Sequence, residues 1–455
     1  MARGKKKEST LTSEEKLAQA LVPVEEQPYR VPGNWCWTRI ASLCSLSNGK
    51  AFKPTDWGEV GLPIVRIQNL NNPNAEYNLF SGIVEEKFRL RGNELLFAWS
   101  GTPGTSFGAH IWWGKEAVLN QHIFRVDFDE THINKIFFKY AINQQLDMLI
   151  SVAHGGAGLQ HVTKGVFEST PIPLPPLAEQ QRIVDRIEYL FAKLEEAKEK
   201  AQSVLDSFET RKAAILHKAF TGELTAKWRA KHGVGMDSWQ SETLQSVCSM
   251  KITDGTHKTP TYCDADIGVP FISAKDVTGE AICWDKIKYI VPELHDELYA
   301  RLAPQIDDIL LAKNGTTGVA AIVDVDKVFD LYVTLAVLRP DKSKILPRYL
   351  LRIVNSPVCK NQFDEHLTGI GVPNLHLRDI KEVVIQVPSL AEQTAIIQVV
   401  DSIMGKEQQA KEAAEAVLEK IDLLKKSILA RTFRGKLGTN DSTEESALEL
   451  LKAIL

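Results

Sequence analysis

The chain contains one sequence unit twice. The stretch PPLAEQQRIV, which begins at Pro175, returns 213 residues later as PSLAEQTAII, which begins at Pro388. Aligned without a gap, residues 172–224 and 385–437 are identical at 20 of 53 positions. A repeat of this length constrains the fold more than composition does, because each copy is expected to form the same structural unit.

The repeat continues upstream in a fainter form. NWCWTRIASLCSL, from Asn34, matches SWQSETLQSVCSM, from Ser238. AWSGTPG and GAGLQHV of the first copy match AKNGTTG and GIGVPNL of the second. The offset between matching residues drifts from 204 to 214, so insertions lie in this upstream part. Each copy therefore consists of a divergent domain followed by a closely repeated segment.

The repeated segments carry apolar residues at alternating steps of four and three, which predicts a coiled-coil seam. The first copy supplies Ile183, Ile187, Leu190, Leu194, Val204 and Phe208, and the second supplies Ile396, Val400, Ile403, Val417, Ile421 and Ile428. About 40 residues at 1.5 Å each make a helix roughly 60 Å long. Two such helices in one chain most simply pack together, and antiparallel packing would relate the copies by a pseudo-twofold axis. A parallel pair, or helices that bind partner chains, remains an alternative.

The phrase LAEQ has a local interpretation as a helix start. Ser389 and Glu392 have the spacing of a capping box, in which the hydroxyl and the carboxylate bind the unpaired amides of the first turn. The first copy lacks the hydroxyl, and there Glu179 complements the positive end of the helix dipole. Gly222 and Gly435 fall where the seam stops, as expected of helix C-termini.

The divergent domains mix strand-like apolar runs with short helical stretches, which predicts an α/β or α+β fold. The runs are LPIVRI, ELLFAW, HIFRVDF, VPFISA, DILLA, AAIVDV and YVTLAVL. Loops rich in Gly, Thr, Ser and Asn lie between them in both copies, as in SGTPGTSFG and NGTTG. Such loops are either plain turns or segments that approach another surface closely.

These patterns predict six segments in the chain. They are an N-terminal tail with a short helix (1–33), a first divergent domain (34–171), a spacer helix with a linker (172–236), a second divergent domain (237–384), a second spacer helix (385–438) and a C-terminal helix (439–455). The two terminal helices are amphipathic. They are expected to dock on a partner subunit or on one another, with fraying as the alternative.

Several classes of protein are excluded by missing patterns. The sequence has no G-x-x-x-x-G-K-[ST] phosphate loop, no G-x-S-x-G elbow and no H-E-x-x-H motif, so we expect no catalytic residue, metal or cofactor on this chain. No apolar run approaches 18 residues, so we expect no membrane span and a cytoplasmic chain. Six cysteines without a CxxC pair indicate buried thiols.

Taken together, the repeated motifs resemble the DNA-specificity subunits of type I restriction and modification systems. The marks are the two P-x-L-A-E-Q helix starts, the Phe-x-Gly-x-Leu ends at Phe220 and Phe433, the TAKWR segment from Thr225, and the Gly-x-x-Gly loops before each helix. The resemblance implies two domains that each read one part of a bipartite, asymmetric DNA site. It also implies two methyltransferase subunits docked on the helices, and restriction subunits joined through the complex. S-adenosylmethionine, ATP and Mg²⁺ would then be bound by those partner subunits.

Candidate DNA contacts are polar residues in or beside the matched loops, because amides, hydroxyls and cations hydrogen-bond to base edges and phosphates. They are Lys50, Lys53, Arg66, Gln68, Asn69, Ser100 and Gln160 in the first domain, and Lys258, Ser273, Lys275, Lys313, Asn314 and Asn374 in the second.

The charge balance argues against a free DNA-binding protein. The net charge is −4, residues 34–171 hold 12 basic and 12 acidic residues, and residues 238–384 hold 16 basic and 20 acidic residues. Since counterion release from phosphate supplies much of DNA affinity, we expect weak binding by this chain alone. Two alternatives remain: a duplicated coiled-coil adaptor whose domains bind proteins, and the equivalent subunit of a related system that cuts on both sides of its site.

Overall fold

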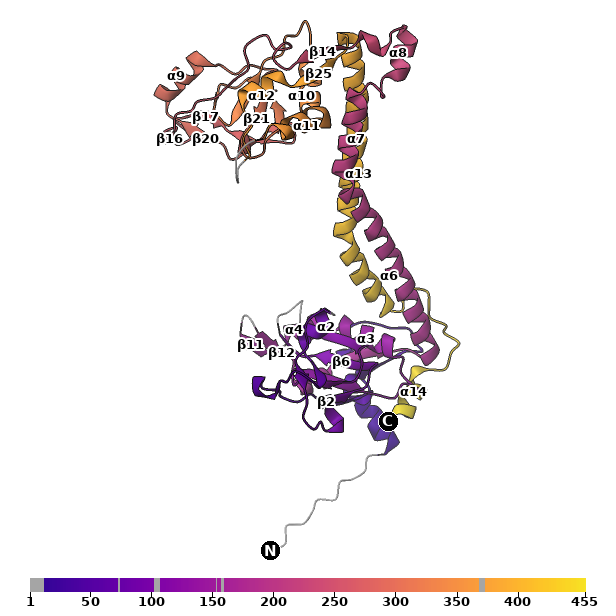
Figure 1. Ribbon diagram of the computed structural model, residues 1–455. Coiled ribbons are helices and arrows are strands. Elements are labelled where there is room, and N and C mark those ends of the chain that lie inside the picture. Colours follow the sequence, from indigo (N-terminus) through magenta and orange to yellow (C-terminus); the bar gives the residue numbers. More distant parts are fainter. Residues whose placement is uncertain (1–11, 73, 102–106, 153, 157–158, 368–372) are drawn as a thin grey trace. The chain divides into compact units, whose positions relative to one another are not determined.

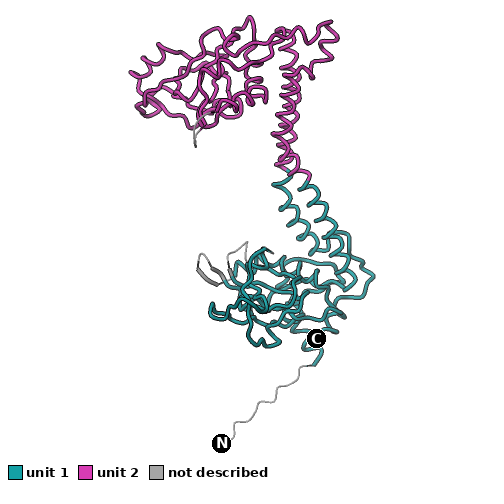
Figure 2. Tube along the Cα trace, in the orientation of Figure 1, with its two compact units in different colours: residues 1–199, 417–455 teal, residues 200–416 magenta. Residues whose placement is uncertain are grey.

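A computed structural model describes residues 12–455 except 73, 102–106, 153, 157–158 and 368–372 (Figure 1). The chain divides into two compact units, Met1–Glu199 with Val417–Leu455, and Lys200–Ala416 (Figure 2). The long helices are α6 (Leu177–Asp206), α7 (Phe208–Phe220) and α13 (Leu390–Thr432). Each unit combines a globular head with parts of the long helices: unit 1 contains most of α6 and the end of α13, and unit 2 contains the end of α6, all of α7 and the first part of α13. The predicted mixed fold with an internal repeat is confirmed.

The two heads share one topology. We call residues 34–174 head 1 and residues 238–387 head 2. The main sheet of head 1 has the order β2 (Ser45–Asn48), β10 (Ile123–Asp127), β6 (Glu94–Ala98), β8 (Gly108–Trp112). That of head 2 has the order β15 (Thr253–Asp254), β24 (Leu335–Leu338), β21 (Ile309–Ala312), β22 (Ala320–Ile322). The four strands correspond one to one.

A second sheet in each head contains a parallel pair. In head 1, β3 (Leu62–Val65) runs parallel to β9 (Ala117–Leu119), and in head 2, β17 (Val269–Ile272) runs parallel to β23 (Asp330–Leu331). In head 1 the order is β4 (Leu79–Phe80), β3, β9, β5 (Arg89–Leu90), and in head 2 it is β16 (Tyr262–Cys263), β20 (Lys288–Ile290), β17, β23. Strand register therefore shows which residues of the two heads are equivalent. Ile64 lies opposite Val118 and Phe271 lies opposite Asp330, so Ile64 corresponds to Phe271 and Val118 to Asp330.

A two-stranded sheet closes each head onto its long helix. β1 (Cys36–Arg39) pairs with β13 (Pro171–Leu174), and β14 (Gln240–Thr243) pairs with β25 (Val384–Val387). The closing strands β13 and β25 are followed directly by α6 and α13. The first and last strands of each head are thus held together beside the helix start.

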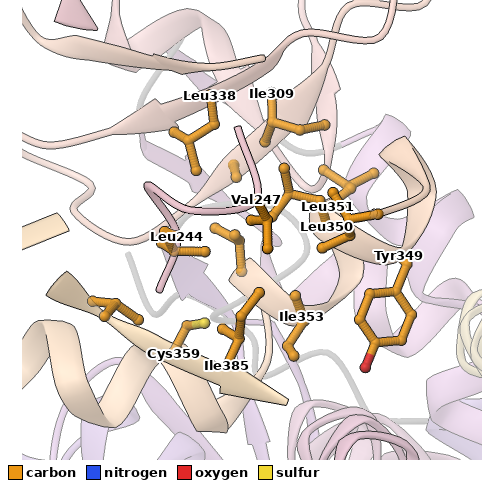
Figure 3. Packing of buried hydrophobic residues seen from close by; sticks show 14 of the residues in the cluster. Leu244, Val247, Ile309, Leu338, Tyr349, Leu350, Leu351, Ile353, Cys359 and Ile385 are labelled. Carbon is orange, nitrogen blue, oxygen red and sulfur yellow. The ribbon is translucent and has the colours of Figure 1, made fainter. Parts of the chain in front are cut away.

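The core of unit 2 extends from the head onto the helices. Figure 3 shows Leu244, Val247, Ile309 and Leu338 packed with residues of α10 (Pro347–Val354), such as Tyr349. The same buried cluster includes Leu216 and Phe220 of α7 and Ile396 and Val400 of α13. In unit 1, a smaller cluster joins Phe137 of α3 (Lys135–Gln144) to Ile183, Ile187 and Phe433.

The long helices pack against each other in antiparallel fashion within each unit. In unit 1, Ile183 and Ile187 of α6 lie near Phe433, and further along α6 Glu195 pairs with Lys425 at 3.4 Å. In unit 2, Lys411 stacks over Phe208, and Arg211 of α7 pairs with Glu407 at 2.8 Å. In these contacts, residue numbers increase along α6 and α7 while those of their partners in and just after α13 decrease. The parallel alternative is therefore excluded.

The seam of α13 differs from the predicted one in its second half, where Leu418 takes the position predicted for Val417 while Ile421 and Ile428 keep theirs. Val417 is 40% exposed, so its placement in the seam is wrong, and Leu418 is more buried. Lys411 and Lys425 are half-buried at two further seam positions, with their ammonium groups 5.0 Å from the centre of the Phe208 ring and 5.8 Å from that of Phe191. Ile396, Val400 and Ile421 are buried.

The remaining predicted seam residues are at least partly buried. In the first copy Ile183, Ile187 and Phe208 are buried, and Leu190, Leu194 and Val204 are half-buried. Ile403 and Ile428 of α13 are also half-buried.

The first spacer is two helices rather than one. It breaks at Ser207, between α6 and α7. The Arg211 side chain holds the break: its Nη2 donates to the Val204 carbonyl at 3.2 Å, its Nη1 contacts the Ser207 hydroxyl, and its Nε donates to Glu407. An arginine that caps an interrupted turn gives the discontinuity an identifiable cause.

Both LAEQ phrases place a glutamate and a glutamine in fully buried positions. Gln180 and Gln393 are 0% exposed. Gln180 accepts from the Asn134 amide at 2.9 Å and donates to the Pro175 carbonyl at 3.1 Å. Gln393 likewise accepts from the Leu346 amide at 2.8 Å and donates to the carbonyls of Lys344 and Pro388. Each glutamine therefore fixes its own head to the helix start.

The glutamates bind the chain that follows the antiparallel partner helix. Glu392 accepts from Thr225 at 2.8 Å, from Arg229 at 2.7 Å and from Trp239 at 3.0 Å, all within unit 2. Glu179 accepts from Thr439 at 2.7 Å and from Arg182 at 2.8 Å within unit 1. The expected capping box at Ser389 is only half formed, because the Ser389 hydroxyl accepts from the Glu392 amide while the Glu392 carboxylate binds elsewhere.

The helix ends follow the repeat. Gly222 and Gly435 adopt positive φ values of 84° and 66° just after α7 and α13, a conformation that favours glycine. Phe220 and Phe433 are 2% and 0% exposed. Phe220 meets Tyr349 and Phe433 meets Phe137 with ring centres 5.2 and 5.6 Å apart.

The two terminal helices pack on one another and on head 1. α1 (Ser13–Ala20) contacts α14 (Ala447–Ile454), and both contribute to the core of head 1. Lys16 donates to the Leu455 carbonyl at 3.1 Å. The C-terminal helix is capped by Ser446, whose hydroxyl accepts from the Leu448 amide.

The cysteines and the helices carry two further findings. All six cysteines are free thiols, but Cys283 is exposed, contrary to the expectation of buried thiols. Among the described residues, no helix has the length and apolar character to cross a membrane.

Two neighbouring α13 residues test the observed seam. Ile421→Ala removes a side chain that is 3% exposed and is expected to lower the free energy of unfolding by about 2–4 kcal/mol. Val417→Ala, on the exposed side, is expected to change it by less than about 0.5 kcal/mol. Urea unfolding followed by the helical circular dichroism signal measures both, and equal losses would contradict the observed seam.

A second test addresses the buried Glu392. Glu392→Ala leaves Arg229, which is 7% exposed, without its carboxylate and is expected to cost about 3–5 kcal/mol of stability. Glu415→Ala, at an exposed position of the same helix, is the matched control with little expected effect. The double variant Glu392→Leu, Arg229→Leu should recover part of the loss. A Glu392→Ala protein as stable as the control would refute this role.

Candidate nucleic-acid interface

In head 2, three of the predicted DNA contacts line one pocket of about 610 Å³. Ser273 and Lys275 follow the carboxyl end of β17, and Asn314 follows the end of β21. The other lining residues are Tyr262, Phe271, Ala274, Asp276, Lys288, Gly315, Thr316, Tyr332 and Thr334. Strand ends from both sheets of the head thus meet at one hollow.

Local hydrogen bonds fix the floor of this pocket. Ser273 begins a 3-10 turn, Ala274–Asp276, and donates from its hydroxyl and its amide to the Asp276 carboxylate at 2.7 and 2.8 Å. The Ala274 amide donates to the Thr334 hydroxyl at 3.0 Å. Because Asp276 is buried and receives these donors, it stabilises the turn and leaves Lys275 pointing to solvent.

Aromatic rings form one wall of the pocket. The ring of Phe271 lies between those of Tyr262 and Tyr332, with centres 6.3 and 5.9 Å away. Tyr262 is 45% exposed, and the Lys288 ammonium lies 4.1 Å from the centre of its ring. The hollow therefore offers aromatic surface, hydroxyls, one amide and two exposed cations.

The equivalent positions in head 1 carry different side chains. By strand register, Arg66, Gln68 and Ser100 are the counterparts of Ser273, Lys275 and Asn314. Arg66 precedes α2 (Ile67–Asn71) as Ser273 precedes its turn, and Gln68 is exposed. Ser100 is buried, at 4% exposure. Six candidates from two heads therefore occupy three equivalent positions.

The glycine-rich loops join the segment before each long helix in both heads. Ser100 of β7 (Ser100–Gly101) pairs with His161 of β12 (Leu159–His161), and Asn314 forms an equivalent bridge with Asn374. Gln160 lies on β12 opposite Gly101. Asn374 is half-buried.

Trp99, the residue before Ser100, lies in an aromatic cluster of head 1. Trp99 contacts His122 and His161 with ring centres 5.4 and 5.8 Å apart. Burial, and secondarily the neighbouring His161, lower the pKa of the His122 imidazole, so the neutral form is favoured. Trp99 donates to Asn48 at 3.4 Å where head 2 has the ion pair of Lys313 with Asp254 at 3.2 Å.

Four other candidates differ in their surroundings. Asn69 is 4% exposed, accepts from the Arg66 amide and donates to the carbonyls of Ala75 and Glu76. Lys313 is 7% exposed and paired with Asp254. These two side chains hold local structure, and we leave them out of the proposed interface. Lys53 is exposed, and exposed Lys258 pairs with Glu297.

Lys50 lies at the edge of the head 1 surface. Its ammonium lies 4.8 Å from the centre of the Phe80 ring, and its backbone bridges Asn120. Asn120 is the counterpart of Tyr332, because Thr256 bridges Tyr332 in head 2. Thus Lys50 adds a cation to a surface that in head 2 presents a threonine.

Sequence reasoning missed the aromatic residues and Lys288. Trp57, Tyr262 and Tyr332 lie outside the glycine-rich loops that guided the selection, and no spacing marks them. Within the described ranges, no group of three or more His, Cys, Asp or Glu side chains is arranged to hold a metal ion.

Two heads of one topology, each with the same surface built from different residues, define a duplicated recognition protein. Residues 32–203 and 236–419 each match the model of the type I restriction modification DNA specificity domain, and the chain belongs to this family.

Known relatives match nearly the full length of the chain. It is 26% identical over 447 residues to the Type I restriction enzyme EcoBI specificity subunit of Escherichia coli, which covers 92% of this chain and 91% of that protein. It is 26% identical over 406 residues to the MjaVIII specificity subunit of Methanocaldococcus jannaschii, covering 86% and 92%. The fold is similar to that of the HsdS subunit from Thermoanaerobacter tengcongensis, with a TM-score of 0.64 at 19% identity over 91% of this chain and 100% of that one.

Equivalent glycines test the shared frame of the two surfaces. A Cβ at Gly49 would lie 2.1 Å from the Asn120 carbonyl oxygen, and one at Gly255 would lie 2.1 Å from that of Leu331. Gly49→Ala and Gly255→Ala are each expected to cost about 1–3 kcal/mol, because backbone must move. Gly405→Ala, on α13 with open space around it, should stabilise by about 0.5–1 kcal/mol. Urea denaturation measures the free energy of unfolding of all three variants. Equal changes in the three would contradict the close backbone approach at Gly49 and Gly255.

Proposed function

We propose that this chain is the sequence-specific DNA-binding subunit of a type I restriction and modification complex, and that it recognises a bipartite, asymmetric DNA site. The observation that carries the proposal is the pair of equivalent surfaces. Head 1 presents Arg66, Gln68 and Ser100 where head 2 presents Ser273, Lys275 and Asn314. A constant frame with changed donors and acceptors is what two readers of two different half-sites need.

The partners in this proposal are double-stranded DNA, two methyltransferase subunits and, through them, restriction subunits. The chain itself is non-catalytic, and S-adenosylmethionine, ATP and Mg²⁺ belong to the partners. We place the complex in the cytoplasm, where the chromosome is its substrate. The paired helices would set the gap between the half-sites and carry the methyltransferase subunits.

Charge supports a division of DNA binding between this chain and its partners. The 12 basic and 12 acidic residues of segment 34–171, and the 16 and 20 of segment 238–384, give the heads little net attraction for phosphate. We therefore expect the isolated chain to bind its target weakly and the assembled complex to bind it tightly.

A protein-binding adaptor would also need two heads on paired helices. It does not account for polar donors and aromatic rings gathered at the same surface of both heads. The equivalent subunit of a system that cuts on both sides of its site has the same architecture, and its nuclease subunit distinguishes it.

Coexpression with a methyltransferase subunit encoded beside this chain tests the proposal. Mapping of methylated adenines in genomic DNA is expected to give a split, asymmetric motif. Replacing residues 34–171 with the corresponding domain of another family member should change one half of that motif and leave the other half and the gap unchanged, because each head reads alone.

Two results would refute the proposal. One is a methylation pattern that is independent of this chain, and the other is a domain exchange that alters both halves of the motif together. A comparison of the isolated chain with the complex on target duplex completes the test, since tight and specific binding by the chain alone would contradict the proposed division of binding.

A further inference from the structure

Each head presents an exposed aromatic ring with a cation placed over it, at equivalent positions. In head 1 the Arg66 guanidinium lies 5.5 Å from the centre of the Trp57 ring, and in head 2 the Lys288 ammonium lies 4.1 Å from that of Tyr262. Trp57 and Tyr262 are 40% and 45% exposed. Both pairs border the surface described above.

Strand register makes the two rings equivalent. Gly58 bridges Leu79, which also pairs with Pro63 of β3. Cys263 pairs with Tyr289, which also pairs with Pro270 of β17. Trp57 and Tyr262 are the residues immediately before Gly58 and Cys263. The two cations come from non-equivalent positions: Arg66 follows β3, and Lys288 lies on β20. The ring with a cation over it therefore recurs in both heads, although the cation is supplied by a different part of the sequence.

The two cations also lack an anionic partner among the described residues. Arg66 and Lys288 form no ion pair there, and Arg66 Nε is buried without a hydrogen-bond acceptor. By contrast, Lys313 and Lys258 of head 2 are both paired with carboxylates. A cation that is oriented by a ring and left without a counterion is preorganised for an external anion.

The chemistry of the surface favours a phosphate of a nucleic-acid backbone over a free anion. An exposed ring beside the cation gives apolar contact area suited to a deoxyribose, and the neighbouring amide and hydroxyl groups of Asn314 and Thr316 suit base edges. Cationic side chains on phosphates fix the position of a protein on a duplex, whereas base contacts specify sequence.

We propose that Trp57 with Arg66, and Tyr262 with Lys288, are equivalent phosphate clamps that hold one strand of the target duplex at each half-site. This inference rests on the proposed function and assigns different roles within its interface. Arg66 and Lys288 position the heads on the backbone. Gln68, Lys275 and Asn314 stand where bases are read.

Binding of the assembled complex to duplex DNA over a range of salt concentrations tests the clamps. Lys288→Gln is expected to weaken binding about tenfold on both target and scrambled duplexes, because a charge-assisted contact to phosphate is lost. The slope of log K against log salt should fall by about 1. The methylated motif should stay the same. Arg66→Gln should behave alike through head 1.

Matched variants separate a clamp from general electrostatics and from folding. Lys286→Gln removes the same charge from an exposed position two residues away and should change affinity and salt slope much less. Lys288→Arg and Tyr262→Phe keep a cation over a ring and should retain binding, whereas Tyr262→Ala should lose affinity with little change in salt slope. Lys115→Gln serves as the control for head 1.

Three outcomes would overturn the inference. The first is a Lys288→Gln complex with unchanged affinity and salt slope. The second is a Lys288→Gln complex whose affinity and salt slope equal those of Lys286→Gln. The third is a Lys288→Gln complex with an altered methylated motif, since Lys288 would then read bases. The slope of log K against log salt on scrambled duplex tests the proposed phosphate contact even for a complex that has no preferred site. Absence of a preferred site in the wild-type complex would instead refute the proposed function.

Discussion

A buried carboxylate at the first turn of each long helix is the constraint on which the architecture depends. Burying a carboxylate is costly unless charged or polar donors surround it. Glu392 has three such donors, Thr225, Arg229 and Trp239, and all of them belong to chain that follows α7. The adjacent Gln393 binds backbone groups of its own head and of Pro388, which lies between β25 and the helix. Two consecutive side chains therefore fasten three segments at one point: the head, the helix start and the exit from the antiparallel partner. We call this point the joint. A helix cap alone would require only the carboxylate, so the repeated glutamine of LAEQ is explained by the joint and not by the cap.

The joint also makes the two copies of the repeat depend on each other. Glu179 belongs to the first copy, but Thr439, which donates to it, follows the helix of the second copy. Glu392 belongs to the second copy, and its donors follow the helix of the first. Each compact unit consequently contains residues from both copies, which is why unit 1 includes Val417–Leu455. Thr439, and the three donors of Glu392, reach their glutamates only when the helices run antiparallel. Electrostatic satisfaction and the apolar seam thus favour the same arrangement, and such agreement between independent terms favours a single fold.

The fold could be predicted from the sequence where apolar spacing had one interpretation. The runs ELLFAW and DILLA became the central strands β6 and β21, and the first-copy seam through Ile183 and Ile187 is buried as spaced. Prediction failed where two apolar residues were adjacent, because Val417 and Leu418 satisfy either of two heptad registers and packing against the partner chooses between them. It also failed where a polar residue entered the seam: the aliphatic stems of Lys411 and Lys425 can lie across phenylalanine rings. For the surface, repeated glycine-rich loops located Ser100 and Asn314. Composition could not distinguish the solvent-exposed Lys275 from Lys313, whose Asp254 partner is 59 residues away in sequence.

The heads combine a rigid frame with replaceable contacts. Where β2 and β15 end, Gly49 and Gly255 let the chain approach a neighbouring backbone so closely that no Cβ fits, so this crossing is the same in both heads. Around it the side chains differ freely: an indole bound to Asn48 in one head stands where a lysine bound to Asp254 stands in the other. Since the frame is set by main-chain geometry and buried apolar residues, exchange of a surface side chain alters donors and acceptors at little cost to folding. A chain built in this way can hold two different recognition surfaces in one topology, and the difference between them lies in a few side chains at the strand ends.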